Sequence, residues 1–376
     1  MARVSLIYCM DYERSRVFDA VRKAVDLVGG IGKFVSPNMK VLIKPNLLSA
    51  RTPEEAVCTH PEVVRAVVRL VKETGAVALV GDSPGGYGAN IDDIFEKSGV
   101  GPAAREEGAE LVRFASSKFV EGVPIARHVF DCDRVISIPK FKTHSVTVLT
   151  AAIKNTYGMV TGLYKAERHA YAPREEDFAK VIAGVYSLTR PHLTILDGIV
   201  GMEGDGPSAG KPRSLKLVMA GEDAVAIDSC AARIVGLDPL DIAVTKEAYR
   251  MKLGEADMSK IEVVGDDING FIVADFRLPQ TTALKILPKA LVNTVAGLAR
   301  FKPYINFNVC KKCNLCKVAC PVSAITIEKN ECFIDYHKCV RCMCCHEVCP
   351  YKAIYIKRTV LAKIIWGRNT GAGGNY

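Results

Sequence analysis

The chain has 376 residues, more than one hydrophobic core usually serves, so its length predicts more than one domain. Its 49% hydrophobic and 24% charged residues exclude a disordered chain. No apolar run approaches the ~18 residues of a membrane-spanning helix, and no signal-peptide cleavage site follows the first residues, so we expect a cytoplasmic location and no transmembrane segment.

The net charge of +9 belongs almost entirely to the C-terminal fifth of the chain. Residues 301–376 hold 12 Lys and Arg against 4 Asp and Glu, which leaves 38 against 37 for residues 1–300. A basic segment of this kind suits nucleic acid or anionic lipid. The cysteines of the same segment favour metal binding instead, and we expect no nucleic-acid partner.

Short apolar runs alternate with helix-like patterns along the first 280 residues. This alternation predicts an α/β fold, a sheet flanked by helices. The predicted strands are 4–8, 40–44, 77–80, 111–114, 134–138, 192–196, 215–219 and 261–264. The predicted helices are 14–28, 61–74, 91–98, 146–157, 175–188, 224–235 and 241–251.

Polar residues beside Gly and Pro follow four of the predicted strands. In open α/β sheets ligands bind at the carboxyl ends of strands, so these exits mark one composite site. They begin at Lys44, Gly81, Pro139 and Asp197 and read KPN, GDSPGG, PKFKTH and DG. From these exits, the turn after the fourth and the helix after the third, we expect the substrate-binding residues to be Lys44, Asn46, Asp82, Ser83, Lys154, Asn155, Asp197 and Asp205.

The third exit carries the candidate catalytic residues. Lys140 and Lys142 stand just before a predicted helix, whose first N–H groups and dipole attract anions. His144 follows two residues later and is a candidate proton donor. These three residues predict a site for a small anionic substrate. A solvated loop with a hydrogen-bonded histidine is the competing interpretation, and both stay open.

The glycine-rich run after Gly81 either cradles a phosphate or turns the chain. It is neither a P-loop, because it lacks G-K-[ST], nor a GxGxxG dinucleotide fingerprint. Asp82, Asp197 and Asp205 offer oxygen ligands for Mg²⁺, but aspartates at strand ends and helix caps need no such function.

Six runs in this region resemble the family called domain of unknown function 362, over about residues 38–240. They read IKPNL, GDSPGG, IPKFKTH, AAIKNTYGMVTG, DGIVGMEGDGP and AGEDAVAIDSCAARIVG. The family is often fused to a ferredoxin-like module, so the resemblance implies an α/β fold associated with iron–sulfur chemistry. It implies no reaction. The matching residues include those that the strand exits select.

Ten of the 14 cysteines lie between Cys310 and Cys349. They include two C-x2-C-x2-C-x3-C runs, each followed by Pro, and residues 304–358 resemble bacterial-type ferredoxins with two [4Fe–4S] clusters. In that pattern the fourth cysteine of each run binds the other cluster. The predicted ligands are Cys310, Cys313, Cys316 and Cys349 for cluster 1, and Cys339, Cys342, Cys345 and Cys320 for cluster 2.

Two other cysteines of the region are not predicted to be ligands. Cys344 stands beside Cys345, but the spacing selects Cys345. Cys332 lies between the runs, where it is predicted to be part of the core. Zinc ribbons also use C-x2-C pairs and are the competing interpretation of the whole segment.

The predicted organisation is an α/β domain at 1–280, a linker at 281–303, a small α+β ferredoxin-like domain at 304–358 and a Gly-rich tail at 359–376. The linker has an apolar stripe, which suits docking between the domains or binding at a membrane surface.

Three functions are compatible with these features. The first is an iron–sulfur oxidoreductase whose clusters pass electrons to an anionic small molecule, with an electron donor or acceptor protein as partner. The second is an electron-transfer module that docks on a larger redox complex, and the third is a redox-sensing or cluster-assembly protein. The covalent fusion favours the first, because tethering keeps the electron donor at high effective concentration beside the site.

Overall fold

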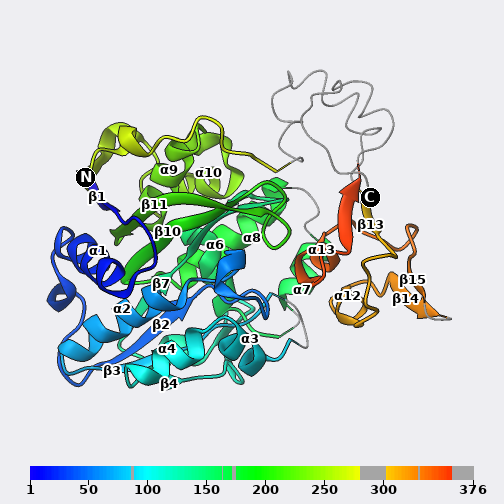
Figure 1. Ribbon diagram of the computed structural model, residues 1–376, viewed down its shortest axis with the longest axis horizontal. Coiled ribbons are helices and arrows are strands. Elements are labelled where there is room, and N and C mark those ends of the chain that lie inside the picture. Colours follow the sequence, from blue (N-terminus) through cyan, green and yellow to red (C-terminus); the bar gives the residue numbers. More distant parts are fainter. Residues whose placement is uncertain (86–88, 163, 172–174, 280–301, 329–330, 358–376) are drawn as a thin grey trace.

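The computed structural model describes residues 1–85, 89–162, 164–171, 175–279, 302–328 and 331–357. Figure 1 shows a larger sheet domain and a smaller module beside it. The predicted tail and nearly all of the predicted linker lie outside the described residues, so the predicted domain boundaries stay predictions. Strand β13 begins at Lys302, inside the predicted linker.

A ten-stranded mixed sheet forms the centre of the larger domain, which confirms the predicted α/β class. Its strands in spatial order are β12 (Ile261–Gly265), β1 (Ala2–Tyr8), β11 (Lys211–Gly221), β10 (Leu193–Glu203), β7 (Arg134–Ile138), β2 (Lys40–Pro45), β3 (Val77–Val80) and β4 (Glu110–Leu111), with β8 (Lys140–His144) and β9 (Val148–Thr150) branching from β10. Strands β10, β7, β2, β3 and β4 are parallel, so their carboxyl ends meet at one edge. A separate hairpin, β5 (Ser117–Val120) and β6 (Val123–Ala126), was not predicted.

Helices cover both faces of the sheet and enclose two apolar cores. The helices of one face are α1 (Arg14–Asp26), α2 (Pro61–Glu73), α3 (Ile91–Lys97) and α4 (Val100–Glu106). Those of the other face are α6 (Ala152–Asn155), α8 (Glu175–Leu188), α9 (Ala224–Ile234) and α10 (Ala243–Arg250). Short helices α5 (His128–Asp131) and α7 (Tyr164–Tyr171) complete the domain. Among the described helices, none combines the length and hydropathy needed to cross a membrane.

The spacing of apolar residues and the N-terminal cap explain why the segment of α2 is helical. Val63, Val67 and Val71 recur at helical spacing, and all three are buried against the sheet. Pro61 occupies the first helical turn, where its missing N–H costs nothing. The ring Nδ1 of His60 caps the helix by accepting the N–H of Glu62 at 3.3 Å.

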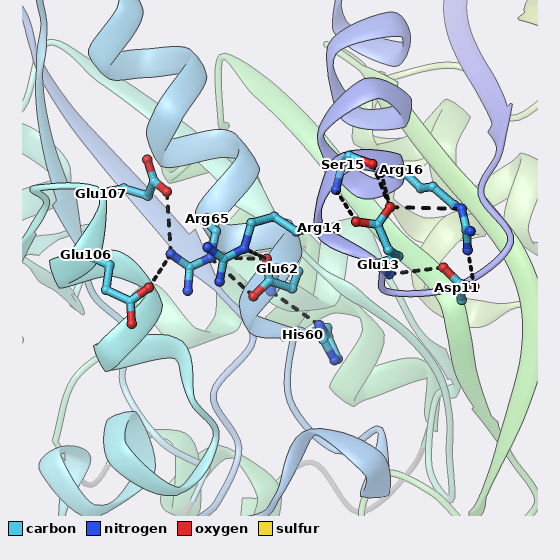
Figure 2. Close-up of polar contacts among 10 residues, drawn as sticks. All are labelled: Asp11, Glu13, Arg14, Ser15, Arg16, His60, Glu62, Arg65, Glu106 and Glu107. Carbon is cyan, nitrogen blue, oxygen red and sulfur yellow. Dashed lines mark hydrogen bonds and ion pairs between the residues drawn. The ribbon is translucent and has the colours of Figure 1, made fainter.

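Ion pairs join α2 to its neighbours, as Figure 2 shows. Arg65 contacts Glu62 on its own helix at 3.1 Å and Glu106 of α4 at 2.6 Å. Arg14 of α1 reaches the same Glu62 at 3.2 Å. These contacts hold the start of α2, and with it the backbone of His60, against the sheet edge.

The segment after β7 corrects one prediction. A helix was expected over 146–157, but strands β8 and β9 form a hairpin, and only Ala152–Asn155 and the 3₁₀ turn Thr156–Met159 are helical. The expected anion site at a helix start directly after Lys142 is therefore wrong. Val146, Thr147 and Val148 are β-branched, and pairing of β8 with β10 and β9 decides the outcome.

The smaller module consists of two similar halves, which confirms the predicted α+β domain. Its strands are β13 (Lys302–Ile305), β14 (Ile325–Glu328), β15 (Glu331–Ile334) and β16 (Ile354–Lys357), and its helices are α12 (Leu315–Val318) and α13 (Cys344–Val348). Strand β13 pairs with β16, and β14 pairs with β15. Positive φ angles recur at equivalent places of the two cysteine runs, as at Asn314 (64°) and Met343 (63°). The two halves therefore share one backbone design.

Candidate functional site

Lys44, at the end of β2, forms the centre of a buried polar group. Its Nζ lies 2.7 Å from Asp82 Oδ1, which follows β3, and donates to Asn155 Oδ1 of α6 at 2.9 Å. Both charged side chains are almost completely buried. Burial lowers the pKa of Lys44 and raises the pKa of Asp82, while their mutual attraction opposes both shifts. The structure thus brings together polar residues of three separate segments at the carboxyl edge of the sheet.

Lys140 belongs to a second buried group. Its Nζ lies 2.8 Å from Asp197 Oδ2 and donates to the hydroxyl of Tyr12 at 2.7 Å. That hydroxyl in turn donates to Asp197 Oδ1 at 2.7 Å, and the backbone N–H of His60 donates to Asp197 Oδ2 at 2.9 Å. Tyr12 was not predicted. It follows β1, which ends at the same sheet edge, so the strand-exit rule applied to β1 would have selected it.

A cavity of about 70 Å³ opens next to the Lys44 group. It is far smaller than usual ligand sites of ~300–1,000 Å³, so it suits only a small molecule. Eight of its lining residues are charged, carry an amide or are serine: Asn46, Asp82, Ser83, Lys142, Lys154, Asn155, Lys165 and Glu347. Six of these eight were predicted site residues, and Lys165 and Glu347 were not.

Three lysines dominate the electrostatics of the cavity. Lys142 Nζ donates to the carbonyl of Val57 at 2.7 Å, and burial lowers the pKa of Lys142 to about 7. Lys165 Nζ donates to Ser83 Oγ at 2.8 Å, and burial also lowers the pKa of Lys165 to about 7. Burial lowers the pKa of Lys154 as well. Lys142 and Lys165 can therefore release a proton near neutral pH, and each carries the positive charge that attracts an anion only while it is protonated.

His144 lies outside the cavity lining. It is fully buried, and its Nδ1 accepts the N–H of Val146 at 3.0 Å. Its Nε2 lies 3.0 Å from Glu347 Oε1 of the module, so it belongs to the contact between the two bodies. Of the other predicted residues, Lys140 and Asp197 form the second group described above, and Asp205 lies in the turn after β10.

No magnesium site is supported by these carboxylates. Asp82 and Asp197 each contact a lysine ammonium, which competes with a cation for the same oxygens. Among the described residues of the sheet domain, no three His, Cys, Asp or Glu side chains form a group that could hold a metal ion.

Helix α13 of the module lies beside the sheet domain (Figure 1), and its residue Glu347 is part of the cavity lining. Ser208 Oγ donates to the carbonyl of Glu347 at 2.8 Å. Arg51 is buried, and its Nη2 donates to the carbonyl of Cys349 at 2.9 Å. Glu347, between the predicted ligands Cys345 and Cys349, therefore lies within the cavity lining.

The eight predicted cluster ligands surround two cavities inside the module. The first cavity is lined by Cys310, Cys313, Cys316 and Cys349, together with Cys332. The second is lined by Cys320, Cys339, Cys342 and Cys345. This is the grouping that the crossed ferredoxin pattern predicts. Thiols spread around a cavity suit a four-iron cluster better than a single zinc ion, whose ligands must approach to ~2.3 Å.

The fourth cysteine of each run, which is predicted to bind the cluster of the other run, accepts an equivalent backbone hydrogen bond in the two halves. The N–H of Ala324 donates to Cys320 Sγ at 3.1 Å, and the N–H of Ala353 donates to Cys349 Sγ at 3.2 Å. Hydrogen bonds of this kind stabilise thiolate charge. Cys344 is not part of the lining of either cavity, in keeping with the choice of Cys345.

Comparisons with known proteins agree with this division of the chain. A family model described as a domain of unknown function (DUF362) matches residues 41–233. A model described as a 4Fe-4S binding domain matches residues 303–326 and 333–355. The thylakoid-associated protein sll1697 of Synechocystis sp. is 34% identical over 257 residues, which cover 66% of this chain and 79% of that protein.

Two solved structures show weak similarity. The lactate racemase apoprotein from Thermoanaerobacterium thermosaccharolyticum has a TM-score of 0.41 at 10% identity, covering 63% of this chain and 58% of that one. A protein from Thermotoga maritima has a TM-score of 0.36 at 14% identity, covering 64% and 59%. The chain spans less than two thirds of either, and similarity at this level transfers no activity.

Proposed function

Because the chain belongs to the DUF362 family and carries a 4Fe-4S binding domain, we propose that it is an iron–sulfur oxidoreductase that reduces a small anionic molecule in the lysine-lined cavity. One observation carries the proposal. Glu347 lies between two proposed cluster ligands and also lines the cavity with Lys142, Lys154 and Lys165. A substrate in the cavity is therefore separated from the cluster-binding segment by a single side chain.

The proposed cluster ligands are the two sets of four cysteines that line the cavities of the module. When bound, the two clusters supply electrons one at a time. The family and the module support iron–sulfur electron transfer, and the reduction of a substrate is the further step of this proposal.

The residues of the cavity divide into anion binders and a buried frame. Lys142, Lys154 and Lys165 supply positive charge for a carboxylate or a similar anion. The buried Lys44–Asp82 ion pair forms part of the frame next to the cavity, and its two opposite charges neutralise each other. A two-electron reduction consumes two protons, and the Nζ atoms of Lys142 and Lys165, with pKa values of about 7, hold protons that they can give up near neutral pH.

The test follows cluster reoxidation by absorbance. The purified protein is reduced anaerobically and mixed with a panel of small carboxylates and carbonyl acids. We expect one class to reoxidise the wild type and to fail with Lys142→Met. Lys23→Met, which changes an exposed lysine of α1, is the matched control and should behave as wild type.

Equal reoxidation of the wild type and Lys142→Met by every compound would refute the proposed site. No reoxidation by any member of the panel would favour the second function, an electron-transfer module for a larger complex. The homologue from Synechocystis is named for a thylakoid association, and we propose a cytoplasmic location for this chain. Fractionation of the native cells tests that location directly.

A further inference from the structure

The two halves of the module present equivalent surfaces that have very different surroundings. Leu315 and Val318 of α12 occupy the same places in the first cysteine run as Cys344 and Glu347 of α13 in the second. Cys344 and Glu347 are 8% and 7% exposed, because they pack on the sheet domain. Leu315 and Val318 are 37% and 48% exposed.

The exposed surface is strongly basic. Between Cys310 and Val318 there are three lysines and no acidic residue, and all three lysines are exposed. Cys313, a proposed ligand of cluster 1, is exposed among them. We define the outer face by its exposed basic and apolar residues, which are Lys311, Lys312, Leu315, Lys317 and Val318.

We propose that the outer face docks an acidic one-electron carrier protein, which supplies electrons to cluster 1. The module already uses the equivalent surface of its second half to dock, with an acidic residue, Glu347, against a lysine-rich site. The first half presents the opposite charge, so its complement is an acidic surface. Apolar residues within a basic rim are typical of transient protein interfaces.

The electron balance of this step is simple. The reduced carrier loses one electron, the oxidised cluster gains one, and no proton moves. Cys310, Cys313, Cys316 and Cys349 would hold cluster 1, which would receive electrons beside the exposed Cys313, and the half that contacts the sheet domain would pass them toward the cavity. This inference deepens the proposed function by naming the donor class and the face that receives it.

The probe is a photoreduced flavodoxin, a small acidic one-electron carrier. Reduction of the oxidised holoprotein is followed by stopped-flow absorbance with no substrate present, and binding of oxidised flavodoxin is measured by calorimetry. The test variant is Lys311→Glu/Lys312→Glu/Lys317→Glu. The control, Lys23→Glu/Lys72→Glu/Lys118→Glu, makes the same change in net charge at exposed lysines of the sheet domain.

We expect the outer-face variant to lower the rate constant of cluster reduction roughly tenfold or more and to weaken binding, with little change in the control. Raising the ionic strength from about 0.02 to 0.3 M should slow the wild type and leave the outer-face variant nearly unchanged. Because cysteine ligands adjoin Lys311 and Lys312, iron content is measured for each variant. If the Lys→Glu triple variant loses iron, the assignment of the outer face is tested instead with the Lys→Gln variant at the same three positions and with the salt dependence of the wild-type rate.

Equal slowing of both triple variants would show a whole-molecule charge effect and overturn the assignment of the outer face. A wild-type rate that does not depend on salt would overturn it too, as would self-association of the chain through this face. Because the assay contains no substrate, docking can succeed while the proposed reductase activity fails, and the two failures are separate.

Discussion

Gly158, in the 3₁₀ turn after α6, packs closely against the Lys44–Asp82 pair. A Cβ added there would lie 2.3 Å from Asp82 Oδ1 and 2.6 Å from Lys44 Nζ, whereas real Cβ contacts are essentially never below 3.0 Å. In Gly158→Ala, Asp82 Oδ1 must therefore move away by about 0.7 Å and Lys44 Nζ by about 0.4 Å to reach the 3.0 Å limit. Lys44 Nζ contacts Asp82, the carbonyl of Pro45 and Asn155, so moving this ammonium group disrupts these three contacts.

The expected cost has two parts. Overpacking a filled interior costs about 1–3 kcal/mol. Disrupting a buried ion pair costs up to about 3–5 kcal/mol, because it leaves charge unpaired in the interior. Alanine recovers up to about 1 kcal/mol relative to glycine in a helical turn. Gly158→Ala shifts the pair without removing either charge, so only part of the second cost applies, and we expect the free energy of unfolding of the sheet domain to fall by about 2–4 kcal/mol.

The assay is equilibrium urea unfolding of the anaerobic holoprotein, followed by circular dichroism. Gly184→Ala is the matched control, because Gly184 lies inside α8 and an added Cβ meets nothing within 4 Å. The free energy of unfolding of this control should equal that of the wild type or exceed it by up to about 1 kcal/mol, so its unfolding midpoint should lie at the same or a slightly higher urea concentration. If Gly158→Ala stays within about 0.5 kcal/mol of the wild type, the reasoning about a rigid buried pair is refuted.

Three further predictions use other parts of the structure. The pKa of Lys142 falls from 10.5 to about 7 on folding, so above pH 7 the unfolded chain binds more protons and stability rises with pH. Lys142→Met should remove about 2 kcal/mol of the rise in unfolding free energy between pH 7 and 9, and an unchanged slope would contradict this. Iron analysis should show Cys345→Ser losing about half of the eight irons of two clusters, and Cys344→Ser losing none. Arg51→Met should increase hydrogen exchange in α13, whereas the exposed Arg69→Met should not, and equal exchange in both would exclude the Arg51 contact as an anchor.

Local patterns were sufficient where neighbouring residues alone decide the structure. The cysteine spacing places three thiols within one short stretch, so it predicted the module and which thiols line each of its two cavities. Val63, Val67 and Val71 repeat at helical spacing, and α2 formed over nearly the predicted range. The exits at Lys44 and Asp82 met because parallel strands of one sheet end at one edge.

The same reasoning failed where pairing between distant segments decides. The β-branched run after His144 fits a helix or a strand by its pattern alone, and pairing of β8 with β10 and β9 selected the hairpin. The sequence did not show that His144 would contact Glu347 of the module, and the catalytic role of His144 stays a prediction. No pattern in the sequence predicted that Lys165 lines the cavity.

The sequence by itself therefore determined that the chain is an α/β domain joined to a two-cluster module, because strand periodicity and cysteine spacing act over a few residues. Only the tertiary structure decided which lysines line the cavity and that Glu347 reaches it. The environment of a buried ammonium group is made by β8, α6, α7 and the module together. Contacts between such segments have no fixed spacing along the chain, so a linear pattern does not record them.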